Sequence, residues 1–175
     1  MEYLTEKEAI DLLILHAEKF ANRRWSDAVK NRIIDTYNTV LSLNKMLPRH
    51  YKIQQHDAWE CVFASVVAIE AGFLQYNVIP MECSCIEQMN LFKKMNRFIE
   101  RNSEPKRGDY VYYNWNYDSI PHHVGIVKDV SLNHITVIEG NNNDKVKIVK
   151  RPKVSYCILG YGRPDYTKIP KNRVW

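Results

Sequence analysis

Residues Asp57 to Phe73 read DAWECVFASVVAIEAGF, and the rest of the chain is best understood from this run. Its apolar residues predict a buried helix, in which small alanine and serine residues fill the gaps and Gly72 marks the end. Glu60 and Cys61 both fall in the expected first turn. Free backbone N–H groups and the positive end of the helix dipole stabilise an anion there, so the position favours a thiolate or a carboxylate.

Two downstream segments offer partners for such an anion. The segment HHVGIV places His123 at the head of a predicted strand, and VIEGN places Glu139 and Asn141 at the end of the next one. An anion at a helix start, a histidine on a strand and a polar group that orients it are the parts of a hydrolase with an activated nucleophile.

Helical patterns occupy the first half of the chain. TEKE forms a capping box from Thr5 to Glu8 and predicts a helix after it, and a second pattern runs from about Ser26 to Leu43. A third helix is expected after Ser84, with Glu87 at its box position.

Short strands separated by turn residues follow, and Arg151-Pro152 is one of the expected turns. Helices first and strands afterwards predict an α+β domain with an antiparallel sheet of five to six strands, packed against the helices. We expect a single domain over 1–175, with a helical cap at 1–50, a core at 51–166 and a tail at 167–175. The predicted strands are Tyr110–Trp115, His123–Val130, His134–Glu139, Val146–Lys150 and Cys157–Gly162.

Composition narrows the range of partners. The 175 residues have a formal net charge of +5, and the basic residues are dispersed rather than gathered in a stripe, so nucleic acid is not an expected partner. No apolar run is long enough to span a membrane, and the first residues lack the shape of a signal peptide. We therefore expect a protein made in the cytoplasm, which would reach an external target after lysis or by non-classical export.

The four cysteines form neither a disulfide framework nor paired CxxC motifs. We expect them to be reduced, and we expect no metal and no other cofactor. The sequence does not indicate an oligomeric state.

Eight segments from about Ile34 to Tyr166, taken in order, resemble the CHAP family of cysteine- and histidine-dependent amidohydrolases and peptidases, of the type found in phage endolysins. The resemblance implies a papain-like fold and the hydrolysis of amide bonds in peptidoglycan or muropeptides, by an amidase or a cross-bridge endopeptidase. The segments are IIDTYN, LPRHYKI, DAWECVFASVVAIEAGF, VIPMECSC, PKRGDYVYYNW, HHVGIV, ITVIEGN and ILGYGRPDY.

Position by position, the resemblance implies that His123 is the general base, Glu139 its orienting partner and Asn141 a further polar helper. The flanking residues Trp59, Phe63 and Ser65 match the family and place its nucleophilic cysteine at position 60, where this chain has Glu60. Cys61 is the alternative nucleophile. One helical step turns a side chain by about 100° and shifts it by about 1.5 Å, so we expect Cys61 to point away from the strand of His123.

The substitution at Glu60 leaves several functions open. The resemblance favours an enzyme. Glu60, however, is a poor nucleophile for acyl transfer, and this favours an inactive scaffold that binds wall fragments or a partner. Glu60 and Glu139 could instead form a carboxylate pair for glycoside hydrolysis, or Glu60 and His123 could join a metal site. Three aromatic residues are candidates to line a substrate groove: Trp59, Trp115 and Tyr117.

Overall fold

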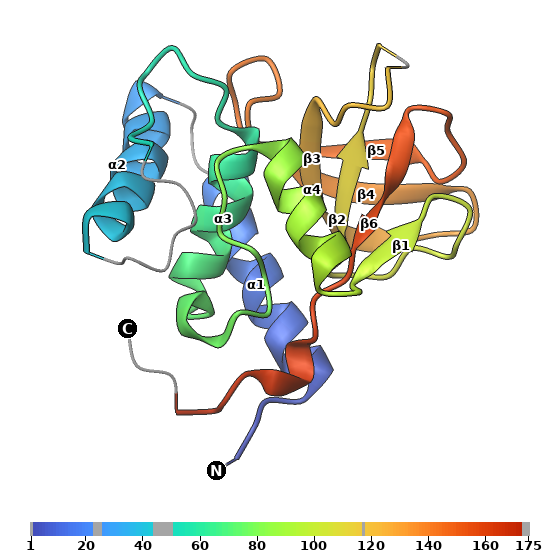
Figure 1. Ribbon diagram of the computed structural model, residues 1–175, viewed down its shortest axis with the longest axis horizontal. Helices are drawn as coiled ribbons and strands as arrows, with labels where there is room; N and C mark the ends of the chain where they lie inside the picture. The colour runs from blue at the N-terminus through green and yellow to red at the C-terminus, as the bar shows by residue number, and fades with distance from the viewer. Residues whose placement is uncertain (1, 23–25, 44–50, 117, 173–175) are drawn as a thin grey trace.

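A computed structural model describes residues 2–22, 26–43, 51–116 and 118–172 (Figure 1). Helices form one layer and a six-stranded antiparallel sheet forms the other. The α+β fold expected of a papain-like CHAP domain is therefore confirmed.

Two of the helices begin where their capping residues predict. Thr5 and Glu8 form the expected capping box, with Glu8 N donating to Thr5 Oγ1 (3.2 Å) and Thr5 N to Glu8 Oε2 (2.8 Å). Ser84 caps the fourth helix through the backbone N–H of Glu87. The helices are α1 (Glu6–Ala21), α2 (Asp27–Leu43), α3 (Glu60–Glu70) and α4 (Cys85–Lys94), with short 3-10 turns at Leu74–Tyr76 and Tyr166–Lys168.

Helix α3 is the buried centre of the molecule. Every residue from Glu60 to Ile69 is buried, because α3 packs against the sheet as well as against α1, α2 and α4. Helix α2 lies on the side of α3 away from the sheet (Figure 1). Helix α3 ends as predicted at Gly72, whose φ of +77° is left-handed, while Phe73 N donates to Ala68 O (2.9 Å).

The sheet has the strand order β1-β6-β2-β3-β4-β5, with antiparallel pairing throughout. Apart from shifts of one or two residues at the ends of β2, β5 and β6, two details differ from the sequence prediction. Strand β1 was not predicted, because three residues are too few to show an alternating pattern. Arg151 and Pro152 lie in β5 rather than in a turn, and an edge strand tolerates a proline without N–H. The strands are β1 (Phe98–Glu100), β2 (Tyr110–Tyr113), β3 (His123–Val130), β4 (His134–Glu139), β5 (Lys147–Pro152) and β6 (Ile158–Gly162).

The sheet packs on both faces. Tyr110 and Tyr112 belong to the main core with the helices, whereas Val111 and Tyr113 belong to a second cluster on the opposite face. His123 is paired with Tyr113 and therefore projects from that second face.

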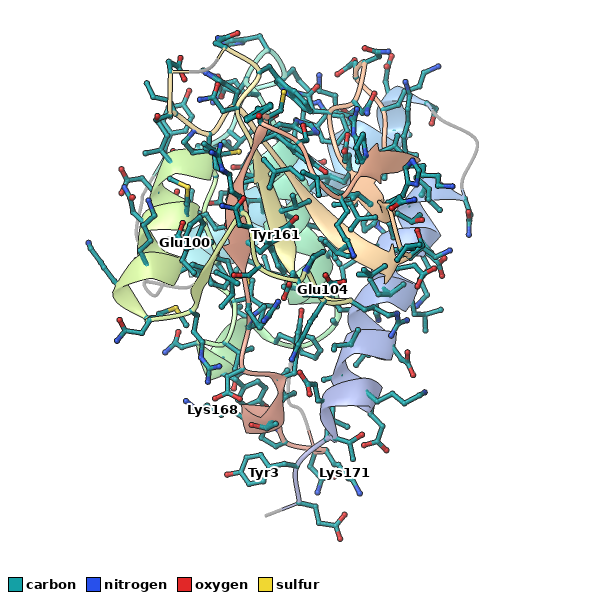
Figure 2. The ribbon with its side chains drawn as sticks, turned by 90° about the vertical axis from the view of Figure 1, so that its right-hand side faces the viewer. Tyr3, Glu100, Glu104, Tyr161, Lys168 and Lys171 are labelled. Carbon is teal, nitrogen blue, oxygen red and sulfur yellow. The ribbon has the colours of Figure 1, made fainter. Side chains whose placement is uncertain are left out.

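The segments near the two ends of the chain run side by side. Tyr3 forms a bridge with Pro170, and Leu4 N donates to Ile169 O (2.8 Å). Figure 2 shows Tyr3 and Lys171 close together beyond the end of the helical layer. Within the described ranges, no helix has the length and apolar character needed to cross a membrane.

Candidate functional site

His123 and Glu139 meet on neighbouring strands. In the β3–β4 register Glu139 lies opposite Gly125, two residues beyond His123, and its Oε2 is 3.2 Å from Nε2 of His123. A Cβ at Gly125 would lie 2.9 Å from Cγ of Glu139 and 2.4 Å from Val137 Cγ1. Only glycine therefore leaves room for the glutamate to reach back to the histidine.

Glu139 is fully buried and its carboxylate is saturated with hydrogen bonds. Arg151 binds it in a bidentate manner, Nε to Oε1 at 3.0 Å and Nη2 to Oε2 at 2.7 Å, and Asn142 Nδ2 donates to Oε2 at 2.8 Å. Burial favours a raised pKa, but the hydrogen bonds and charges of His123 and Arg151 outweigh it and lower the pKa of Glu139 to about 2. At neutral pH Glu139 is therefore an anion, and its contact with Nε2 holds His123 in place.

Sequence reasoning missed Arg151 and Asn142. Arg151 was assigned to a turn, and its side chain must cross the face of β4 to reach Glu139. The usable signal was weak: Arg151 directly follows the predicted strand Val146–Lys150, and a carboxylate expected to orient a histidine needs a cationic partner if it is buried.

Glu60 is the first residue of α3, where the helix dipole favours a carboxylate. It is 8% exposed, and its Oε2 accepts a hydrogen bond from Asn141 Nδ2 at 2.9 Å. Asn141 belongs to residues 140–146, here called the site loop, which follow β4. Gly140 lets this loop approach α3, since a Cβ there would lie 2.4 Å from Cβ of Phe63.

Glu60 and His123 are connected indirectly. Among the described residues, no hydrogen bond or ion pair joins the two side chains. The site loop links them, because Asn141 binds Glu60 while the next residue, Asn142, binds the Glu139 partner of His123.

Cys61 points into the protein. Its side chain is 1% exposed, and Sγ donates to the backbone oxygen of Glu82 at 3.2 Å. Burial, followed by a hydrogen bond with Cys85 and neighbouring charges, raises the pKa of the Cys61 thiol well above its usual value. This thiol is therefore protonated and does not have the character of an activated nucleophile.

A pocket of about 320 Å³ opens in front of His123. Trp115 forms one wall; its ring is stacked on Tyr113, with centroids 4.9 Å apart and planes inclined by 10°, and the Arg151 guanidinium lies 5.3 Å from its centroid. This cavity, here called the site pocket, is lined by Trp115, His123, Glu139, Asn141, Asn142, Asn143 and Arg151.

The three predicted groove aromatics have different outcomes. Trp115 is 41% exposed and lines the site pocket, whereas Tyr117 lies outside the described residues. Trp59 corrects the prediction, because its side chain is fully buried and cannot contact a ligand in the pocket. Its Nε1 instead donates to Asp144 Oδ1 of the site loop at 3.1 Å.

No metal centre is evident at Glu60 and His123, because the described part of the chain has no group of three His, Cys, Asp or Glu side chains placed to hold an ion.

The fold and this constellation can be compared with known proteins. The model of the CHAP domain family matches residues 52–141, just over half of the chain, and this range contains Glu60, His123, Glu139 and Asn141. No curated protein and no solved structure matches the chain. Because the family match spans both α3 and the β3–β4 pair that build the site, the chain belongs to the CHAP domain family, whose domains are of the peptidoglycan-hydrolase type.

Proposed function

We propose that this chain recognises peptidoglycan in the site pocket but does not cleave it by the family's thiol route. The observation on which this rests is Glu60, a carboxylate at the head of α3 that is held by Asn141 at 2.9 Å. A carboxylate that attacked an amide would form an unstable mixed anhydride, so it is a poor replacement for a cysteine thiolate.

Cys61 does not take over the role in this proposal. Its thiol is engaged with the Glu82 carbonyl, is 1% exposed and has a raised pKa. Reaching the site pocket would require the first turn of α3 to unwind, and catalysis is sensitive to misplacement of even one ångström.

Glycoside hydrolysis by a Glu60–Glu139 pair is also disfavoured. Such a pair needs one carboxyl that holds a proton to donate and one that is free to act on the sugar. Glu139 is ionised, with a pKa of about 2, and its oxygens are engaged by His123, Arg151 and Asn142.

The other residues that line the site pocket fit a ligand with amide groups. The Nε2 atom of His123 is bound to Glu139, so Nδ1 is the ring nitrogen left to bind a ligand. Asn141, Asn142 and Asn143 supply amide groups along one side of the pocket, and Trp115 supplies an aromatic surface. Peptidoglycan has amide groups in its peptide stems, which can bind the asparagine amides, and amino sugars, which can pack on the aromatic surface.

A second candidate is an active wall hydrolase, the amidase or endopeptidase that the family suggests. The intact His123–Glu139 pair favours it, because a base held by a buried carboxylate is of use mainly in proton transfer.

Co-sedimentation with purified Gram-positive peptidoglycan separates these functions. The chain should pellet with the polymer, Trp115→Ala should pellet about tenfold less at equal concentration, and no new soluble fragments should appear in the supernatant by mass spectrometry. Lys7→Met, on the exposed face of α1, is the control and should pellet as the parent does. Fragments released by the unmodified chain would establish the second candidate, and failure to pellet would reject the first.

A further inference from the structure

We infer that Asp144 is a positioning residue: its carboxylate fixes the site loop to α2 and to the start of α3, so that Asn141 reaches Glu60 and Asn142 reaches Glu139. The inference deepens the function proposed above, since the pocket it shapes is the proposed ligand site. The contacts that support it do not depend on that function.

A single oxygen of Asp144 receives two donors from different helical segments. Nζ of Lys30 in α2 lies 2.8 Å from Oδ1, and Nε1 of Trp59 lies 3.1 Å from the same atom. Lys30 also lies over the Trp59 ring, 5.9 Å from its centroid. The hydrogen bonds from Lys30 and Trp59 lower the pKa of Asp144, so it remains the acceptor at neutral pH.

The site loop needs such an anchor because its backbone is strained. Asn141, Asn143 and Asp144 have φ values of +55°, +52° and +56°, in the left-handed region. Asparagine and aspartate adopt this region more readily than other non-glycine residues, but three such residues among four are held best where contacts outside the loop fix them. Inside the loop, Asn142 N donates to Lys145 O at 2.9 Å.

Three side-chain anchors thus hold four consecutive residues. Asn141 is tied to α3 and Asn142 to β4, while Asp144 is tied to α2 and to Trp59. Because the anchors are so close in sequence, releasing the third should let the first two leave their partners. Lys30 and Asp144 both lie outside residues 52–141, so the site depends on a helix that the family match does not cover.

The direct test follows the side-chain amide signals of Asn141 and Asn142 in ¹H–¹⁵N correlation spectra of the full chain. We compare the parent with Asp144→Ala, Lys30→Met and Trp59→Phe, the last of which removes the N–H donor but keeps an aromatic ring in the core. The matched control is Lys153→Met, because its ion pair with Glu104 has side-chain exposures of 17% and 67%, close to the 14% and 60% of Lys30 and Asp144.

Both amide signals should shift or broaden in Asp144→Ala, Lys30→Met and Trp59→Phe, and they should stay in place in the control. Binding of a soluble muropeptide should weaken about tenfold in Asp144→Ala. The double variant Lys30→Met/Asp144→Ala should bind no more weakly than Asp144→Ala alone, because Lys30 acts on the site loop through its contact with Asp144.

Unchanged amide signals in folded Asp144→Ala and Trp59→Phe would overturn the inference. If Asp144→Ala does not fold, Lys30→Met and Trp59→Phe decide the matter. A parent chain that binds no muropeptide would reject the proposed function only, because the amide signals report on the loop without any ligand.

Discussion

At the scale of single residues, the site is organised by a carboxylate rather than by a thiol. Glu139 is fully buried, yet hydrogen bonds from Arg151 and His123 keep it ionised. Arg151 in turn lies over Trp115 and Tyr113, so one guanidinium both neutralises the glutamate and supports the aromatic wall of the pocket.

Arg151→Met should destabilise the protein by about 2–3 kcal/mol, because it leaves a buried carboxylate without its bidentate partner. It should also raise the pKa of Glu139. Urea denaturation at neutral pH measures the first effect. Lys128→Met, which breaks the more exposed ion pair with Glu18, should cost less than about 1 kcal/mol. Equal losses in the two variants would show that Glu139 does not depend on Arg151.

At the scale of elements, the decisive contact is that between the end of β4 and the start of α3. Gly140 lies so close to Phe63 that only a hydrogen atom fits between its Cα and the ring. This approach brings the site loop to the helix start and lets Asn141 reach Glu60.

Gly140→Ala should therefore destabilise the fold by about 1–3 kcal/mol through overpacking against Phe63. Adding Phe63→Leu should recover part of the loss by making room for the methyl group. We would measure thermal unfolding of the parent, the two single variants and the double variant. Strict additivity of the two changes would contradict the proposed clash.

At the scale of the whole molecule, acid should weaken the fold partly through Glu139. Its folded pKa of about 2 lies below the ordinary value of 4.5, so it contributes stability above about pH 4.5 that is lost as the pH falls toward 2. We expect Glu139→Gln to be less stable than the parent at neutral pH and the gap to narrow by up to about 3 kcal/mol in acid. Parallel curves of unfolding free energy against pH would contradict this.

Local signals made much of this architecture predictable. The capping residues Thr5 and Ser84 located two helices, Gly72 located the end of α3, and alternation located β3 and β4 at their observed bounds. The register of Trp59 and Phe63 led to the expectation that Cys61 points away from the His123 strand, and in the structure its Sγ donates to Glu82 O while Asn141 of the site loop binds Glu60.

Long-range side-chain contacts were not predictable. Lys30 and Asp144 are 114 residues apart, and the sequence around neither residue indicates that the two are in contact. Trp59 was taken for a ligand-binding aromatic because aromatic residues serve in cores and in grooves alike, and its full burial emerges only once α2 covers it.

We propose that one residue, Glu60, prevents catalysis in a site whose other residues are in place. The most direct test measures soluble fragments and new amino groups released from purified Gram-positive peptidoglycan by the parent, Glu60→Cys, Glu60→Cys/His123→Ala and Cys61→Ala. We predict release by Glu60→Cys alone, with rapid alkylation of the introduced thiol at neutral pH. If a folded Glu60→Cys variant binds the polymer and releases nothing, or if the parent cleaves and Cys61→Ala does not, Glu60 is not the residue that prevents catalysis.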